Sequence, residues 1–209
     1  MITVKNFEAP ITDTSEILRY AGCKAATPET TDLIGECISE VSDRLSYRVC
    51  YNEYEIVRDG DCLVFGGIST NSETLKKSLK GCERVLIFAA TIGVELDRMI
   101  LKYSRIKPSR ALILQALGTE RIESLCNMFC NQMELRPRVS PGYGDIPLDM
   151  QRDIFRLLDC SRKIGLTLNE QCIMSPTKSV TALAGVGKAA CDTVCKCENC
   201  GNTDCRFRR

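Results

Sequence analysis

The chain is organised around Arg138-Val-Ser-Pro-Gly-Tyr-Gly-Asp-Ile-Pro147, a short segment between two stretches of helical character. Its two prolines and two glycines exclude a regular helix or a central strand. Gly142 and Gly144 tolerate positive φ and allow a ligand close to the backbone. Arg138 adds a permanently charged fork of donors, and Tyr143 adds a ring face. The segment predicts a loop that binds a small charged ligand, although its composition is equally typical of an ordinary turn.

A long helix is expected immediately upstream, over residues 109–134. Pro108 suits the first turn of a helix, and apolar residues then recur at helical spacing. Glu123 and Asn127 are polar and lie four residues apart, so they share one stripe of this helix. Such a pair is usually a solvated edge.

The other segments mix helical and strand patterns without an internal repeat. A continuous apolar run at 85–90 predicts a buried strand. Further helices are expected at 13–21, 28–45, 69–79, 94–103 and 148–160, and further strands at 47–57, 62–65, 164–168 and 179–183, with a hairpin at Asp59-Gly60. The expected fold class is therefore α+β, with helices packed around a twisted, largely antiparallel sheet.

Composition excludes several classes of function. A hydrophobic content of 44% is that of a globular protein, and a net charge of +1 does not favour nucleic acid or an anionic membrane. No apolar run is long enough to span a membrane and no signal peptide is evident, so a cytoplasmic protein is expected. The absence of histidine removes Ser-His and Cys-His nucleophiles and the usual general base.

The 14 cysteines fall into two groups. Residues such as Cys37, Cys126 and Cys130 lie in helical patterns and are expected to be small buried apolar side chains. Five others cluster near the C-terminus, at Cys191, Cys195, Cys197, Cys200 and Cys205. We therefore expect two regions, a globular domain over 1–187 and a cysteine-rich tail over 188–209.

The tail has the spacing of a thiolate metal site. Cys197 and Cys200 are separated by two residues, and Gly201-Asn202 provides a turn around a metal. Cys195, Cys197, Cys200 and Cys205 are the predicted ligands of zinc or of an iron–sulfur cluster. Disulfides and free thiols are the less favoured alternatives, because the chain shows no sign of export.

Several ordered motifs together resemble the activation domain of cobalamin-dependent methionine synthase, which binds S-adenosylmethionine. The central match is Arg-x-x-Pro-Gly-Tyr-x-x-x-Pro over 138–147. Supporting matches are Ile164-Gly-Leu-Thr-Leu-Asn-Glu170, Met174-x-Pro176, Ser179-Val-Thr181 and Ala-Thr-Ile-Gly-x-x-x-Asp-Arg over 90–98, the last of which is similar to free-standing members of the family. The resemblance covers most of the chain up to about Leu183.

The resemblance implies that the protein binds S-adenosylmethionine and helps to remethylate oxidised cobalamin held by a partner. That partner would be a cobalamin-dependent methionine synthase or another corrinoid protein, with a small redox protein as electron donor. Methyl transfer from a sulfonium to reduced cobalt needs no general acid or base, which suits a chain without histidine. The ligand contacts implied are Arg138, Ser140, Pro141, Gly142 and Tyr143, with Glu123 facing the corrin side.

The sequence departs from the family pattern at two places. Leu183-Ala-Gly-Val-Gly187 stands where the family has aromatic residues and a His-Pro, and Gly144-Asp-Ile146 replaces Pro-Ala-Cys. One aromatic wall of the pocket is therefore missing or supplied elsewhere. The alternative function is an iron–sulfur electron-transfer or corrinoid-binding accessory protein without a role for S-adenosylmethionine.

Overall fold

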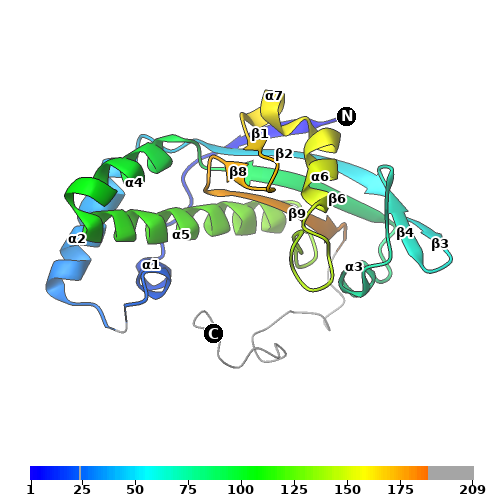
Figure 1. The fold of residues 1–209 in the computed structure, drawn as a ribbon. Coiled ribbons are helices and arrows are strands. Elements are labelled where there is room, and N and C mark those ends of the chain that lie inside the picture. The colour runs from blue at the N-terminus through cyan, green and yellow to red at the C-terminus, as the bar shows by residue number, and fades with distance from the viewer. Residues whose placement is uncertain (24, 188–209) are drawn as a thin grey trace.

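A four-stranded antiparallel sheet forms the centre of the protein in a computed structural model that describes residues 1–23 and 25–187. The strand order is β1-β2-β6-β9, formed by β1 (Thr3–Phe7), β2 (Tyr47–Glu55), β6 (Arg84–Thr91) and β9 (Ser179–Gly185). Every neighbouring pair in this sheet is antiparallel. Helices cover both faces of the sheet (Figure 1). The expected α+β class is confirmed.

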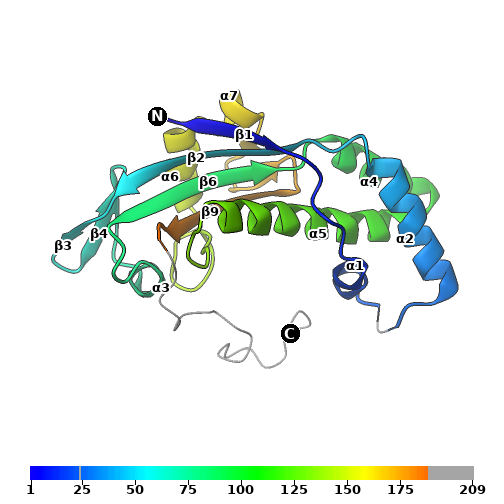
Figure 2. The same cartoon turned by 180° about the vertical axis from the view of Figure 1, so that it is seen from behind.

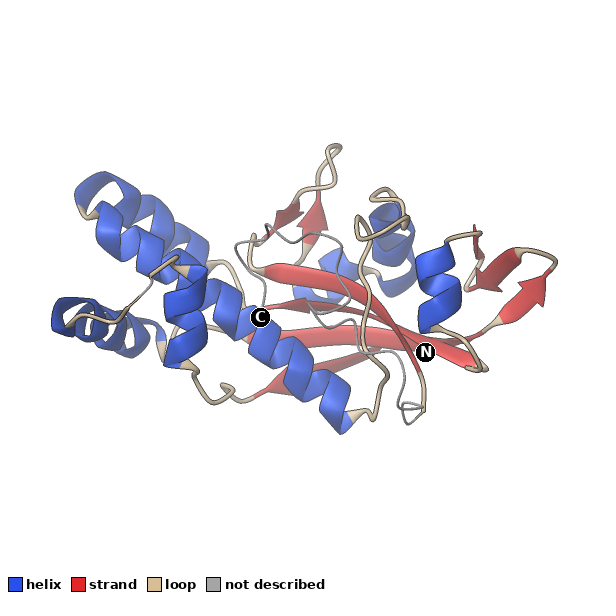
Figure 3. Cartoon of the chain, turned by 90° about the horizontal axis from the view of Figure 1, so that it is seen from below, coloured by secondary structure: helices blue, strands red, loops and turns tan. Residues whose placement is uncertain are grey.

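The long helix α5 (Pro108–Gln132) lies along one face of the sheet, as Figure 3 shows from below. α1 (Thr14–Tyr20), α2 (Pro28–Val41) and α4 (Glu95–Ile106) gather around it. The opposite face is covered by α6 (Met150–Leu158) and α7 (Cys160–Ile164). The predicted helices at 13–21, 28–45, 94–103 and 109–134 are thus present with small shifts at their ends.

The small three-stranded sheet and the short helix beside it lie at the far end of the main sheet from α2 and α4 (Figure 2). β3 (Val57–Asp59), β4 (Cys62–Phe65) and β5 (Ile68–Thr70) form a three-stranded sheet next to α3 (Glu73–Ser78). β7 (Thr167–Leu168) and β8 (Met174–Ser175) form a separate short ribbon. The predicted hairpin at Asp59-Gly60 is confirmed, since Asp59 pairs with Cys62.

The position of β6 between the two layers of helices explains why its sequence is an uninterrupted apolar run. Leu86, Phe88 and Ala90 point into the core beneath α5, whereas the alternate residues Val85, Ile87 and Ala89 point into the core beneath α6 and α7. A central strand covered on both faces has no polar side, so the usual alternation disappears.

One strand was missed, and two predicted elements begin at the wrong residue. β1 was not predicted, and Ser69 and Thr70, expected to begin the helix over 69–79, belong to strand β5, so α3 begins only at Glu73. Ile164 belongs to α7 rather than to a strand, and Gly165 ends that helix with φ of 71°. Within the described residues, no helix combines the length and the apolar character that a membrane span requires.

Candidate ligand-binding groove

The segment between α5 and α6 runs along the outer edge of β9 before it turns away. Leu135 and Val139 form isolated antiparallel bridges with Val186 and Leu183. The backbone N–H of Val139 donates to the Leu183 carbonyl at 2.9 Å, and the Leu183 N–H donates back at 2.8 Å. This pairing fixes the start of the loop, including Arg138, against the sheet.

The loop then folds into a compact turn. Gly142 N–H donates to the Ile146 carbonyl at 2.9 Å, and Tyr143 N–H donates to the Ser140 carbonyl at 3.2 Å. Gly144 has a φ of 59°, and a Cβ at that position would lie 2.4 Å from Thr74 Oγ1. The turn and the nearby α3 therefore require this glycine, independently of any ligand.

Asp145 fastens the turn to the beginning of α3. Its carboxylate accepts hydrogen bonds from Ser72 Oγ at 2.6 Å, from Glu73 N–H at 2.6 Å and from Thr74 N–H at 3.1 Å. The bond from the Ser72 hydroxyl, followed by those from Thr74 and Glu73, lowers the pKa of Asp145 well below its usual value. The departure from the family pattern at Gly144-Asp-Ile146 thus has a structural role in this chain, as the anchor of the loop.

Arg138 is held by the two polar residues that share a stripe of α5. Its guanidinium donates to Glu123 Oε2 at 2.6 Å and to Asn127 Oδ1 at 2.7 Å. Its side chain is 20% exposed, so the charge lies at the groove surface without being fully solvated. Glu123, whose side chain is 42% exposed, and Asn127, which is exposed, do form the expected solvated edge of α5, and the same stripe also presents both residues to the loop.

The cysteines beneath Arg138 are part of the core, as predicted. Cys126 is fully buried, and Cys130 is 8% exposed. Burial raises the pKa of the Cys126 thiol far above its usual value, so this thiol stays neutral and unreactive at physiological pH. Cys37 is likewise buried.

A groove of about 1030 Å3 opens between α5, the loop, α6 and the edge of β9. Its lining includes five of the six predicted contacts, namely Glu123, Arg138, Ser140, Pro141 and Tyr143. Gly142 lies in the same turn but outside the lining. Tyr143 is 71% exposed at the rim and is the one aromatic residue among the described residues that line the groove.

The floor of the groove contains two polar residues that sequence reasoning missed. Gln151 is 7% exposed and Thr181 is 2% exposed, and both line the groove. Within the described part of the chain, neither Gln151 Oε1 nor Thr181 Oγ1 has a hydrogen-bond partner. Buried polar atoms are rarely left unpaired in folded proteins, so these two mark the floor as a place for a polar ligand.

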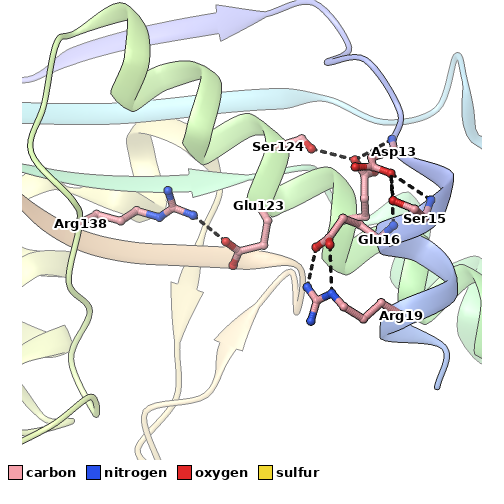
Figure 4. A network of polar contacts seen from close by, with 8 residues as sticks. Asp13, Ser15, Glu16, Arg19, Glu123, Ser124 and Arg138 are labelled. Carbon is pink, nitrogen blue, oxygen red and sulfur yellow. Dashed lines mark hydrogen bonds and ion pairs between the residues drawn. The ribbon is translucent and has the colours of Figure 1, made fainter. Parts of the chain in front are cut away.

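A smaller acidic hollow of about 330 Å3 adjoins the groove, and Glu123 and Asn127 line both. Figure 4 shows Arg138 reaching Glu123 from one side, with Asp13, Glu16 and Arg19 of the α1 region on the other. Glu120 is buried and accepts from Asp13 N–H at 3.2 Å and from Ser124 Oγ at 2.7 Å.

A buried ion pair stabilises this acidic side. Arg121 donates to both carboxylate oxygens of Glu120, and its other donors reach the carbonyls of Pro10 at 2.6 Å and Ile11 at 2.9 Å. These contacts attach the segment before α1 to α5. Sequence reasoning missed Glu120 and Arg121 as well, because charged residues on a buried helix face carry no periodic signal of their own.

The predicted metal site falls in the part of the chain that the structure does not describe. Cys195, Cys197, Cys200 and Cys205 lie outside the described residues. Between residues 1 and 187, with Lys24 excepted, no cluster of three or more Cys, Asp or Glu side chains is arranged to hold a metal ion.

The fold is that of a methionine synthase reactivation domain. A solved structure described as the MetH reactivation domain bound to AdoHcy superposes with a TM-score of 0.65 at 16% sequence identity, over 88% of this chain and 78% of that one. Residues 134–199 match the family described as vitamin B12 dependent methionine synthase, activation domain. The resemblance to the activation domain that the sequence motifs carry is thereby confirmed. No curated protein matches the sequence.

Proposed function

We propose that this protein binds S-adenosylmethionine in the groove and supports reductive remethylation of cobalamin in a partner. The partner is a cobalamin-dependent methionine synthase or a related corrinoid methyltransferase. The observation that carries the proposal is Arg138, held at the groove by Glu123 and Asn127 within a segment that matches the activation-domain family. The AdoHcy bound to the structurally similar reactivation domain supports the same class of ligand.

The charges around the groove suit the methionyl end of this ligand. A guanidinium carries five N–H donors, so Arg138 retains donors for a carboxylate after binding Glu123 and Asn127. The adjoining hollow, lined by Asp13, Glu16 and Glu123, suits the ligand's ammonium and sulfonium groups. A zwitterion needs both signs of charge close together. Arg138 in the loop offers the positive charge, and Glu123 on α5, with Asp13 and Glu16 at α1, offers the negative charge.

The turn suits the rest of the ligand. Ser140 and Pro141 form its near wall, and the exposed ring of Tyr143 is free to lie against a sulfonium or a base. A cation on such a ring face contributes about 0.5–2 kcal/mol. Gly142 lies outside the lining, and its φ of 87° suits the turn that presents Ser140, Pro141 and Tyr143 to the groove.

When bound, S-adenosylmethionine supplies an electrophilic methyl group, and the partner's reduced cobalamin supplies the nucleophile. This chain then has to hold the sulfonium in place, exclude water and present the groove to the corrin, with Glu123 on the corrin side. None of these tasks requires a proton to move, so they are compatible with a sequence that has no histidine. A small redox protein is the proposed electron donor.

A reactivation assay tests the proposal. An oxidised Co(II) synthase is incubated with S-adenosylmethionine, a reductant and this protein, and each component is omitted in turn. The proposal expects recovery of methionine synthesis only in the complete mixture. Recovery that is equal without this protein, or equal without S-adenosylmethionine, would contradict it.

For the tail we propose a thiolate site formed by Cys195, Cys197, Cys200 and Cys205. The support is their spacing. Anaerobic purification followed by metal analysis and an absorption spectrum distinguishes the two candidates. A visible chromophore with iron and sulfide indicates a cluster, and a colourless protein with stoichiometric zinc indicates a structural site. Metal-free protein from both aerobic and anaerobic preparations would refute the site.

A further inference from the structure

Gln151 and Thr181 line the same groove although they are far apart in the sequence. Gln151 is at the start of α6, and Thr181 is in the middle of β9, where alternate residues face α6. Leu183, two residues along β9, belongs to the core beneath α6, so Thr181 points to that same face. Both residues line the groove that also contains Arg138.

Each of these side chains has a buried oxygen that lacks a hydrogen-bond donor or acceptor among the described residues. Gln151 Oε1 and Thr181 Oγ1 are buried without a hydrogen bond to any described residue. Each such atom lowers the stability of the empty protein, because the hydration lost on folding is not replaced. Two such atoms in the lining of one groove point to a ligand that completes their bonding.

The edge of β9 is also open at this point. Val139 pairs with Leu183, and the same antiparallel register would place Pro141 opposite Thr181. Proline has no N–H, and the chain turns away at Gly142, so the loop cannot continue the ladder. The backbone groups of Thr181 face the same edge as those of Leu183, toward the groove. The open edge of β9 thus adds a backbone N–H donor and a carbonyl acceptor of Thr181 to the groove.

We propose that Gln151 and Thr181 form the subsite for the adenine base and select it over other purines. The inference rests on the proposed function, which makes the ligand an adenosyl compound. A carboxamide offers one acceptor and one donor side by side, which matches the N6 amino group and N7 of adenine. Hypoxanthine presents acceptors at both positions, so no orientation of the Gln151 amide satisfies both. The Thr181 hydroxyl supplies a further bond to the base.

Calorimetry with the full chain tests this subsite, using S-adenosylhomocysteine and S-inosylhomocysteine as probes. Wild-type protein is expected to bind the adenosyl compound about tenfold to a hundredfold more tightly than the inosyl one, the discrimination typical of one bidentate contact. Gln151→Leu should bind the adenosyl compound more weakly and lose most of this preference. Thr181→Val should weaken binding by about threefold to tenfold. Gln115→Leu, on the exposed face of α5, is the matched control and should behave as wild type.

Thermal unfolding without ligand separates binding from folding. Gln151→Leu should melt at the same temperature as wild type or higher, because it removes a buried unpaired carbonyl and keeps a similar volume. A large drop in melting temperature would make Gln151 a structural residue and overturn the inference. Equal preference for adenine in Gln151→Leu and wild type would overturn it as well. If wild type binds neither probe, the proposed function itself fails, and the subsite fails with it.

Discussion

The two sides of the groove differ in how their polar groups are satisfied. On the α5 side, Arg138 is bonded to Glu123 and Asn127, and Arg121 is bonded to Glu120. On the floor formed by α6 and β9, Gln151 and Thr181 keep buried polar atoms without partners among the described residues. The polar groups of the paired side are already hydrogen-bonded without a ligand, whereas the floor has polar atoms that a ligand could still bind. We therefore expect substitutions on the first side to change stability and substitutions on the second to change ligand selection.

The largest expected effect comes from breaking the paired side at Arg121. Arg121→Met would leave the Glu120 carboxylate buried without its cation, and the carbonyls of Pro10 and Ile11 would lose their donors. Loss of one partner of a buried ion pair costs about 3–5 kcal/mol in the free energy of unfolding. Urea denaturation measures this loss.

The matched control is Arg156→Met, which removes an exposed pair with Asp153 on α6. Exposed pairs contribute about 0–1 kcal/mol, so this variant should unfold close to wild type. If the two variants unfold alike, the Glu120–Arg121 pair does not stabilise the paired side as described.

A smaller effect is expected where the loop turns toward the floor. Gly144→Ala places a Cβ next to Thr74 Oγ1 in a residue with positive φ, so the free energy of unfolding should fall by about 1–2 kcal/mol. The double variant Gly144→Ala with Thr74→Ala should recover the part that is due to the contact. If the double variant is no more stable than Gly144→Ala, the whole loss in the free energy of unfolding is due to the backbone conformation of residue 144.

The smallest effect concerns the pH dependence of the loop anchor. Because hydrogen bonds from Ser72 and from the start of α3 lower the pKa of Asp145, its contribution to stability is present above the unfolded pKa of about 3.9. That contribution is lost as the pH falls through the lower folded value. Asp145→Asn should remove this component, so its stability should fall less steeply than that of wild type below about pH 4. Parallel profiles in urea titrations would show that the Asp145 carboxylate is not linked to folding.

Much of the fold was predictable because elements that are largely buried have a clear apolar pattern in the sequence. The apolar run of β6 and the helical spacing of α5 belong to the two described elements with the most buried hydrophobic residues. β1 was missed because its side chains are half exposed or exposed, so alternation is weak. The strand expected over 164–168 is present only at its end, as β7, because Ile164 is apolar in either state and only the turn at Gly165 decides where α7 ends.

The candidate site was predictable in part for a similar reason. A motif identified Arg138 and its loop, and helical spacing placed Glu123 and Asn127 on one stripe. Gln151 and Thr181 could not be found in this way, since their proximity depends on how α6 packs over β9. Periodicity predicts which face of an element is buried, but it does not indicate which polar residue on that face lacks a partner.

A titration of S-adenosylmethionine into the wild-type chain and Arg138→Ala tests the central claim most directly. The account predicts one binding site in wild type and a loss of affinity of about tenfold to a hundredfold in Arg138→Ala, the range for bonds to a charged group. Arg156→Ala, a substitution outside the groove lining, should bind as wild type. Absence of binding in wild type, or equal affinity in wild type and Arg138→Ala, would contradict the account.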